Sequence, residues 1–413
     1  MSGIVFKTKL LKNCFANPLT ASLVSDYHPV VALDQGEAMD FALTEEQLAI
    51  QKLARDFSKK EIEPVAAQID RDGKLPDDLI KKYARGGFLG MTLPKKYGGS
   101  GAGNLACALA IEQLASCGSG EWWLVGFNNS IPGSIAHFGS SELKDRILRT
   151  FCDGSAYASI QFTEAETGSD PSALKTTAIP NGHTYVLNGM KCFSTFGARP
   201  GYAVLYAKDD TGGCTAFVIE KVGKGYSAPK TWELMGCGGM EAADVFFEDY
   251  KVSEHNLLGK KGDGIRILLY WIASEKVGQC AAAVGIGQAA LDEASKYTKT
   301  RLSKGKPISM MQGVRWMLAD MDAKLEACRW LTYKTAFAQD KEEAGWQTQA
   351  AAAKLFVIPA AAEIVEMSRR LHGAYGYTKE FKIERLYRAI AGFSVIATSL
   401  EINRSIVGGA VVG

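Results

Sequence analysis

The stretch at residues 263–297 constrains the fold of this chain more than any other. It follows Gly262, contains no proline and consists mostly of good helix formers, so it predicts one long helix. Its first half is apolar on nearly every side, in the run 267–272. An apolar surface of that width predicts a helix that is buried on most sides and that other elements pack around.

Glu275 is the exception on one face of this predicted helix. At helical spacing, that face otherwise consists of Leu268, Ile272, Gln279, Ala282 and Ile286. A carboxylate carried into an apolar place costs on the order of 2 to 7 kcal/mol unless it is hydrogen-bonded. The ordinary interpretation is a solvent-facing glutamate paired with Lys276, because most helical glutamates are exposed. Other parts of the sequence are needed to choose between a buried and a solvent-exposed Glu275.

Composition narrows the classes of function. The chain has 413 residues, of which 47% are hydrophobic and 22% charged, as in a soluble globular protein of two or three domains or one helical body with an inserted module. A net charge of +2 gives no reason to expect nucleic acid or an anionic membrane as a partner. No apolar run reaches the roughly 18 residues of a membrane span. Nine cysteines without a CxxC pair, and only five histidines, argue against a metal centre and indicate free thiols in a reducing compartment.

Residues 1–38 have an irregular pattern and carry Lys7, Lys9 and Lys12 ahead of their first acidic residue, Asp26. We interpret them as an extension or a targeting leader. They contain no arginine, which weakens a mitochondrial leader. We therefore expect a cytoplasmic protein, with the mitochondrial matrix as the alternative.

The hydrophobic pattern then changes twice. Residues 39–155 predict helices, with a capping box at 44–47 and a glycine-rich segment at 97–101 that we interpret as a turn and not as a phosphate loop. Residues 156–260 contain short runs of β-branched and aromatic residues, separated by turn sequences such as those at 180–182 and 188–189. This pattern predicts a small antiparallel β domain and disfavours a doubly wound dinucleotide-binding sheet.

Residues 261–413 return to helical periodicity. The alanine-rich and apolar segment 350–364 predicts a close-packed bundle with a kink or break at Pro359, and residues 386–407 predict a terminal helix. The expected fold class is therefore α+β, with an N-terminal helical domain, a central antiparallel β domain and a C-terminal helical bundle.

Two stretches of the predicted β domain carry recognisable chemistry: residues 162–170 read FTEAETGSD and residues 188–195 read NGMKCFST. With the helix–sheet–bundle order, they resemble the TEPxAGSD and NGxKxWIT motifs of the acyl-CoA dehydrogenase family of flavoproteins. The resemblance extends from residue 39 to the C-terminus. A flavin that receives hydride needs its ring edge stabilised as negative charge develops there, which is the role of the first motif in the family.

The resemblance assigns flavin contacts to both stretches. In the second, Phe193 would cover one face of the flavin and the Thr195 hydroxyl would bond N5, the atom that accepts hydride. In the first, the implied contacts are Ile160, Phe162, Thr163 and Ser169, and Ser169 is also a candidate for binding the CoA chain.

Two further stretches imply FAD contacts in the bundle. Residues 301–306, RLSKGK, followed by Gln312, are similar to the family's RxxFGxxxxxxQ, whose arginine and glutamine reach the FAD of a neighbouring subunit. Residues 370–377, RLHGAYGY, are similar to QxxGGxGY. The FAD contacts implied by this matching are Arg301, Ser303, Gln312, Arg370, Gly373, Ala374, Ser399 and Glu401. Contacts across subunits imply at least a dimer, and we expect a homotetramer built as a dimer of dimers.

The catalytic base is also assigned through the resemblance. Many family members take it from an EGT element near the C-terminus, but residues 397–399, which match that element, read ATS and lack the carboxylate. A minority, including isovaleryl-CoA and long-chain enzymes, supply the base from the long helix, and Glu275 falls on that position. The backbone N–H of Ala397 is retained and would still bond the thioester carbonyl. Trp123 and Gly126 stand near the acyl pocket of relatives and are substrate-binding candidates.

The implied function is FAD-dependent α,β-dehydrogenation of an acyl-CoA to the 2-enoyl-CoA, with Glu275 removing the α-proton and flavin N5 accepting the β-hydride. The implied electron acceptor is an electron-transferring flavoprotein. Two alternatives stay open: an acyl-CoA oxidase-like flavoenzyme, and a catalytically silent member acting as a binding or assembly protein, motivated by Ala397, Lys304 and Arg370. The residues do not choose among branched, aromatic, alicyclic and straight acyl chains.

Overall fold

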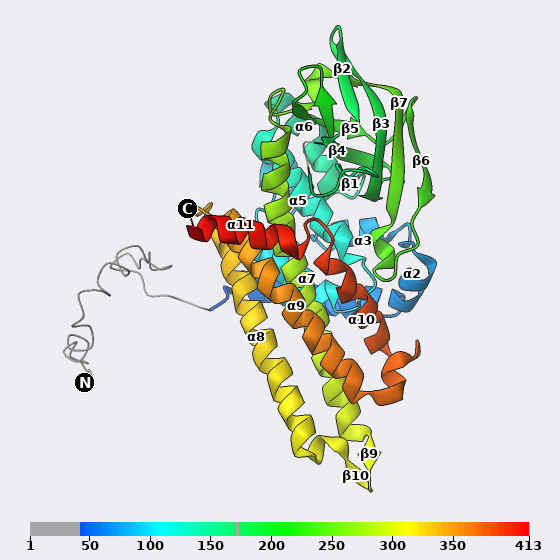
Figure 1. The fold of residues 1–413 in the computed structure, drawn as a ribbon, viewed down its shortest axis with the longest axis vertical. Coiled ribbons are helices and arrows are strands. Elements are labelled where there is room, and N and C mark those ends of the chain that lie inside the picture. The colour runs from blue at the N-terminus through cyan, green and yellow to red at the C-terminus, as the bar shows by residue number, and fades with distance from the viewer. Residues whose placement is uncertain (1–41, 171–172, 413) are drawn as a thin grey trace, which may run out of the picture. The chain divides into compact units, whose positions relative to one another are not determined.

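The computed structural model describes residues 42–170 and 173–412, and the interpretation of residues 1–38 lies outside the described residues. The described chain runs from helices into a sheet and back into helices (Figure 1), so the expected α+β class is confirmed. The glycine-rich segment 97–101 lies between two helices as a turn, as expected. The N-terminal helices are α1 (Glu45–Phe57), α2 (Ala66–Asp72), α3 (Leu79–Arg85), α4 (Gly103–Ala115), α5 (Trp122–Phe138) and α6 (Ser141–Cys152).

The sheet has the strand order β6-β7-β3-β2-β4-β5-β8, with β1 paired to β4. Its pairings are antiparallel except for β1 with β4 and β2 with β4, which are parallel. Side chains from β3, β4, β5 and β7 meet in one buried apolar cluster. The strands are β1 (Tyr157–Gln161), β2 (Thr177–Asn181), β3 (Thr184–Thr195), β4 (Gly201–Asp209), β5 (Cys214–Glu220), β6 (Tyr226–Thr231), β7 (Ala242–Ser253) and β8 (Leu257–Leu258).

Two details of the sheet differ from the expectation. Asn188 and Gly189 do not form a turn; they lie inside β3, at a bulge where the pairing with β7 shifts register. Gly189 is required there, because its φ is +142° and a Cβ would lie 2.7 Å from the Cα of Thr176. Strand β6 was not predicted, because it is an edge strand whose mostly exposed side chains show no apolar alternation.

Three long helices, α7 (Gly264–Thr300), α8 (Gln312–Asp340) and α9 (Trp346–Leu371), lie side by side in the C-terminal bundle (Figure 1). The predicted long buried helix is confirmed as α7, which has 37 residues and is therefore about 55 Å long. It packs against α4 and α5 as well as α8 and α9, which explains its apolar surface. No helix in the described ranges is long and apolar enough to cross a membrane.

The bundle corrects two expectations. Helix α9 continues through Pro359 without a break, because packing against α7 and α8 outweighs the one helix hydrogen bond that a proline removes. The terminal helix predicted at 386–407 is instead two helices, α10 (Lys382–Ala391) and α11 (Leu400–Val412). A 3-10 turn at Gly392–Ser394 and a left-handed Ala397, at φ +63°, separate them, since a left-handed residue ends a right-handed helix.

Gly285 lets α7 approach α4 until the two backbones touch. A Cβ at Gly285 would lie 1.9 Å from the backbone oxygen of Glu112. Glu112 is itself fixed, because its carboxylate accepts hydrogen bonds from Arg329 Nε at 3.2 Å and from the Tyr333 hydroxyl at 2.6 Å, both on α8. The seam between α4 and α7 therefore has no space for a side chain at this point.

We expect Gly285→Ala to lower the free energy of unfolding by roughly 1–3 kcal/mol or more, because the backbones must separate to admit the methyl group. The matched control is Gly278→Ala on the same helix, where the added Cβ would lie 3.7 Å from Ile111 Cδ1, an ordinary contact. The control should be neutral or up to about 1 kcal/mol more stable, since alanine is the better helix former. Thermal denaturation of both variants gives the comparison, and equal Tm values would contradict the close contact.

Candidate active site

Glu275 lies in the first half of α7 and is only 1% exposed. Its Oε2 accepts a hydrogen bond from Ser130 Oγ of α5 at 3.4 Å, and Oε1 has no hydrogen-bond partner among the described residues. Trp271 Nε1 donates to the same Ser130 Oγ at 3.2 Å and so holds this hydroxyl in place. The solvent-facing interpretation of Glu275 is therefore wrong. The buried Gln279 amide, one turn further along α7, also stabilises the carboxylate and lowers its pKa, but its geometry is too loose for a regular hydrogen bond.

The protonation of Glu275 is set by burial. Loss of water raises the pKa of its carboxyl to about 8, and the charge of Lys354 on α9 opposes this rise only in part. Lys354 is also fully buried, which lowers its pKa to about 8. A carboxyl with a pKa near neutrality can both take and give a proton at the pH of a cell, as acid–base catalysis requires.

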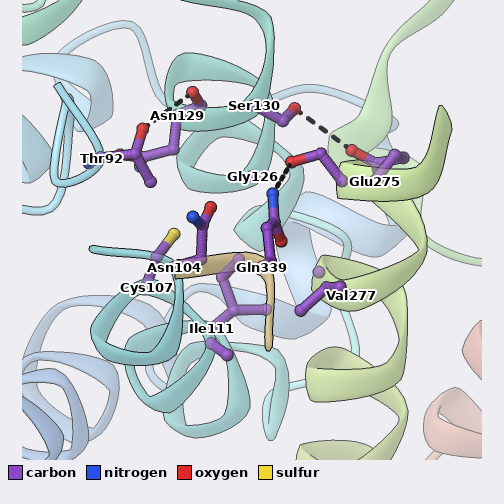
Figure 2. Close-up of a pocket in the computed structure, with 13 residues that line it drawn as sticks. Thr92, Asn104, Cys107, Ile111, Gly126, Asn129, Ser130, Glu275, Val277 and Gln339 are labelled. Carbon is purple, nitrogen blue, oxygen red and sulfur yellow. Dashed lines mark hydrogen bonds between the residues drawn. The ribbon is translucent and has the colours of Figure 1, made fainter. Parts of the chain in front are cut away.

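Glu275 lines a small cavity of about 30 Å³, whose other lining residues come mostly from α4, α5, α7 and the end of α8. Figure 2 shows these residues around it. A larger cleft of about 340 Å³ adjoins the cavity, and Asn104, Ser130, Ser274 and Gln339 line both. The further wall of the cleft includes the exposed residue Glu342. The buried carboxylate therefore lies in a cavity beside a wider cleft that reaches exposed residues.

Of the two substrate-binding candidates on α5, Gly126 lines the cavity beside Glu275 and Trp123 does not. Trp123 is 1% exposed and its ring stacks on that of Trp122, with the centroids 4.3 Å apart. It also packs against Phe127 and Phe393, so its position is that of a core residue.

Phe193 presents its ring to the outside of the sheet. The register of β3 against β7 shifts between Lys191 and Ser194, and Phe193 takes φ +53° within this bulge. As a result its side chain is 53% exposed, and one ring face stacks on Trp232 with the centroids 5.1 Å apart. An aromatic residue held in this way offers a surface for a second planar ring.

The structure brings the end of β1 next to the end of β3, and so brings together five of the flavin candidates, namely Ile160, Phe162, Thr163, Phe193 and Thr195. Ser194 Oγ donates to the Ile160 carbonyl at 3.1 Å, and the Cys192 amide donates to the Thr163 carbonyl at 2.8 Å. Ser159 Oγ donates to the Thr195 carbonyl at 2.7 Å. Phe162 belongs to the same group, whereas Ser169 lies further along, on an exposed bend.

A buried ion pair explains why this region holds its shape. Lys191 is fully buried and its Nζ donates to Glu164 Oε1 at 2.7 Å and to the Phe162 carbonyl at 3.1 Å. Glu164 also accepts from the amides of Lys175 and Thr176. Glu164 of the FTEAETGSD stretch therefore has a structural role, because it holds this segment in place. The backbone and hydroxyl groups around it are left for a ligand.

The remaining FAD candidates lie elsewhere. Arg301, Ser303 and Gln312 are at the far end of α7 and the start of α8, and 26 residues separate Arg301 from Glu275, which is about 39 Å along a helix axis. The segment with Arg370, Gly373 and Ala374 joins this distal end, where Tyr297 stacks on His372 with the centroids 4.4 Å apart. Within one chain the two sets of candidates are therefore not brought together.

The turn before α11 carries the last candidates. Lys354 Nζ donates to the Ile396 carbonyl at 2.6 Å and so ties this turn to α9. Ala397 follows, exposed and left-handed, and Ser399 Oγ accepts from the Ile402 amide at 3.4 Å where α11 begins. Glu401 pairs with Arg404, at 3.0 Å, on the surface of α11.

Three domain models of one family cover almost the whole described chain: the N-terminal domain of acyl-CoA dehydrogenase at residues 44–155, its middle domain at 159–250 and its C-terminal domain at 262–412. The chain belongs to the acyl-CoA dehydrogenase family. It is 36% identical over 375 residues to the acryloyl-CoA reductase (NADH) of Anaerotignum propionicum, covering 89% of this chain and 95% of the relative.

Solved structures of acyl-CoA dehydrogenase relatives agree. The butyryl-CoA dehydrogenase of Megasphaera elsdenii is 32% identical, with a TM-score of 0.88 over 91% of this chain and all of that one. A chain from the structure described as the electron transferring flavoprotein of Acidaminococcus fermentans is 33% identical, also with a TM-score of 0.88, over 90% of this chain and 99% of that one.

As an acyl-CoA dehydrogenase, the chain is an FAD-dependent oxidoreductase, and its residues fit the cofactor. The half-exposed Phe193 ring provides a stacking surface on the strand that also carries Thr195. At the distal end, the exposed Arg301 and Gln312 offer donors suited to a pyrophosphate.

Several residues of this acyl-CoA dehydrogenase site were missed from the sequence. Ser130 and Gln339 line the cavity, and Lys354 faces Glu275. A signal for Ser130 was present, because three polar residues, 128–130, interrupt an otherwise apolar helix. Lys354, among alanines, was a second such signal, whereas nothing near Gln339 marked it as different from any polar residue at a helix end.

If Phe193 binds the flavin, Phe193→Ala should weaken FAD retention by roughly 10-fold, the effect of losing one favourable ring stack. Ile179→Ala is the matched control, because Ile179 is also about half exposed, at 48%, on the same sheet. The ratio of flavin to protein absorbance after gel filtration, and titration of the apoprotein with FAD, measure the effect. Equal FAD content in the two variants would remove Phe193 from the site.

Proposed function

We propose that this enzyme dehydrogenates an acyl-CoA thioester to the 2-enoyl thioester, with Glu275 as the base that removes the α-proton. The observation that carries the proposal is a buried carboxylate, 1% exposed, with one oxygen unpartnered and a cavity beside it. The C-terminal turn supports it, because Ala397 supplies no carboxylate there. FAD, when bound, takes the β-hydrogen as hydride, or returns it in the reverse reaction.

The surrounding residues each have a proposed part in handling the proton. Ser130 holds one carboxylate oxygen of Glu275, so that the other is directed at the substrate. Lys354 ties down the turn that presents the Ala397 N–H, the proposed donor to the thioester carbonyl. Burial excludes water from Glu275 and strengthens its interaction with the α-proton.

We also propose an assembly of at least two chains, and by family resemblance a homotetramer. The support is the distance of about 39 Å along α7 between Glu275 and Arg301, because FAD bound near Phe193 of one chain would meet the Arg301 of another. An electron-transferring flavoprotein is the proposed electron acceptor, which the likeness to the Acidaminococcus fermentans structure supports. The proposed location is the cytoplasm.

The reverse reaction, reduction of a 2-enoyl-CoA, is a second candidate function. A relative named acryloyl-CoA reductase favours it, and so does the chemistry of Glu275. With a pKa of about 8, Glu275 is mostly protonated at pH 7 and is ready to donate to the α-carbon.

Anaerobic spectroscopy tests the proposal and separates the two directions. The purified yellow holoenzyme is mixed with a panel of straight, branched, aromatic and alicyclic acyl-CoAs, and bleaching of the flavin absorbance reports dehydrogenation. In the opposite experiment the reduced enzyme is mixed with the matching enoyl-CoAs, and the return of absorbance reports reduction. Bleaching by no member of the panel would contradict the proposal, and rapid reoxidation by air would favour an oxidase.

A further inference from the structure

Gln339 is a buried polar residue that the proposed reaction does not use. It lies in the last turn of α8, is 7% exposed and lines the cavity that Figure 2 shows. It also lines the adjoining cleft. Its Nε2 donates to Ser274 Oγ at 2.8 Å, while its Oε1 is buried with no hydrogen-bond partner among the described residues. Ser274 directly precedes Glu275 in α7, and Gln339 and Glu275 line the same cavity.

Two other polar side chains on the same wall, Asn129 and Asp340, are already paired. The Asn129 amide is used completely: its Oδ1 accepts from the Thr92 amide, and its Nδ2 donates to the Phe88 and Val125 carbonyls. Asp340 accepts from the backbone N–H groups at the start of α4 and from the Asn104 side chain. Oε1 of Gln339 is therefore available to a bound substrate. A complex that left this buried oxygen without a hydrogen bond would be less stable.

We propose that the acyl group of the substrate carries a hydroxyl at its far end, and that Gln339 selects for it. The inference rests on the proposed function, which places the α-carbon at Glu275 and the remainder of the acyl group in the space beyond. A hydroxyl both donates and accepts, so it pairs with this amide whether the oxygen or the NH₂ group faces the cavity. An apolar chain end would bury the amide unpaired against the polar wall of Thr92, Asn104 and Ser130.

The space beside Glu275 has a narrow part and a wide part. The cavity of about 30 Å³ next to Glu275 is narrow, and the cleft of about 340 Å³ beyond it is wider. The mouth of the cleft carries Asp340 and Glu342 together with His137. An amine-bearing acyl group attracted by these carboxylates is the competing ligand, and a cavity filled by water alone is the other alternative.

The test compares matched thioesters on the full-length holoenzyme. Anaerobic bleaching rates are measured with hexanoyl-CoA, 6-hydroxyhexanoyl-CoA and 6-aminohexanoyl-CoA, and with the corresponding four-carbon acyl-CoAs. We expect the hydroxylated compound to be preferred over the unsubstituted one by roughly 10-fold in kcat/KM, the worth of one buried hydrogen bond. Equal or better turnover of the unsubstituted chain, or preference for the amine, would overturn the inference. Bleaching by none of these compounds or the wider panel would overturn the proposed function and the inference with it.

Variants assign the preference to Gln339. Gln339→Leu should remove the roughly 10-fold advantage of the hydroxylated chain, so that the ratio of kcat/KM for 6-hydroxyhexanoyl-CoA over hexanoyl-CoA falls to about one or below. Ser274→Ala, which removes the partner that orients the amide, should reduce the advantage by a smaller factor. FAD content and Tm are recorded for both variants. A folded Gln339→Leu enzyme that keeps the full preference would show that other groups select the substrate, and should the variant not fold, the Ser274→Ala result decides.

Discussion

Glu275→Gln is expected to lower kcat by about 10² to 10⁴-fold, which is the range that a positioned general base contributes. The amide has nearly the same shape as the carboxyl and still fits the buried site, but it cannot take the α-proton. FAD content should be unchanged, because no proposed flavin contact depends on this side chain. Stopped-flow bleaching with the best acyl-CoA of the panel measures the loss.

The matched control is Glu293→Gln, the same chemical change further along α7 and outside the cavity; it should keep full activity. In the wild type, kcat/KM for dehydrogenation should rise about 10-fold per pH unit below pH 8 and level off above it, because only the ionised carboxylate is a base and burial raises its pKa to about 8. The enoyl-CoA reduction should show the opposite slope. Substantial activity in Glu275→Gln, or a profile with no inflection near pH 8, would remove Glu275 from this role.

The same substitution should make the protein more stable, and increasingly so as the pH rises. Between the ordinary carboxyl pKa of 4.5 and the raised value of about 8, the folded protein keeps a proton on Glu275 that the unfolded chain releases. Stability is therefore lost as the pH rises through this window. A rise of the pKa from 4.5 to about 8 corresponds to roughly 5 kcal/mol above pH 8, and glutamine, which does not ionise, avoids this loss.

Differential scanning calorimetry at pH 5 and pH 8.5 measures this prediction. The Tm difference between Glu275→Gln and wild type should widen by about 5 °C between the two pH values, given the entropy of unfolding of a chain of this size. Glu293→Gln should show a difference that does not depend on pH. A constant difference for Glu275→Gln would mean that the carboxylate is ionised in the folded state already at low pH.

The sequence was sufficient to predict those features that one segment determines by itself. The helix α7 followed from its apolar run, and the change to strands followed from β-branched residues and turns. The prediction of a turn at Asn188 and Gly189 was wrong. An Asn-Gly pair by itself signals a hairpin turn, and only the pairing with β7 makes it a bulge. The break at Ala397 was hidden for a similar reason: an alanine gives no local indication of a left-handed backbone.

The candidate site was predictable to a smaller extent. Glu275 was found because it interrupts an apolar face, and its burial agrees with that pattern. Gln339 could not be found, since its meaning arises from α8 ending beside Ser274 of α7, and a hydrogen bond between residues 65 positions apart leaves no trace in either segment. Residues that act through contacts between distant segments require the fold before they can be recognised.

Substrate range and catalytic power can evolve separately in such a chain. The backbones of α7 and α4 are in contact at Gly285 and Glu112. The position of α7, and with it that of Glu275, therefore does not depend on which side chains line the cavity. Substitutions at positions such as Gln339 or Asn104 can then change which acyl group binds without displacing the Glu275 carboxylate. A lineage of enzymes could in this way diversify its metabolism one wall residue at a time.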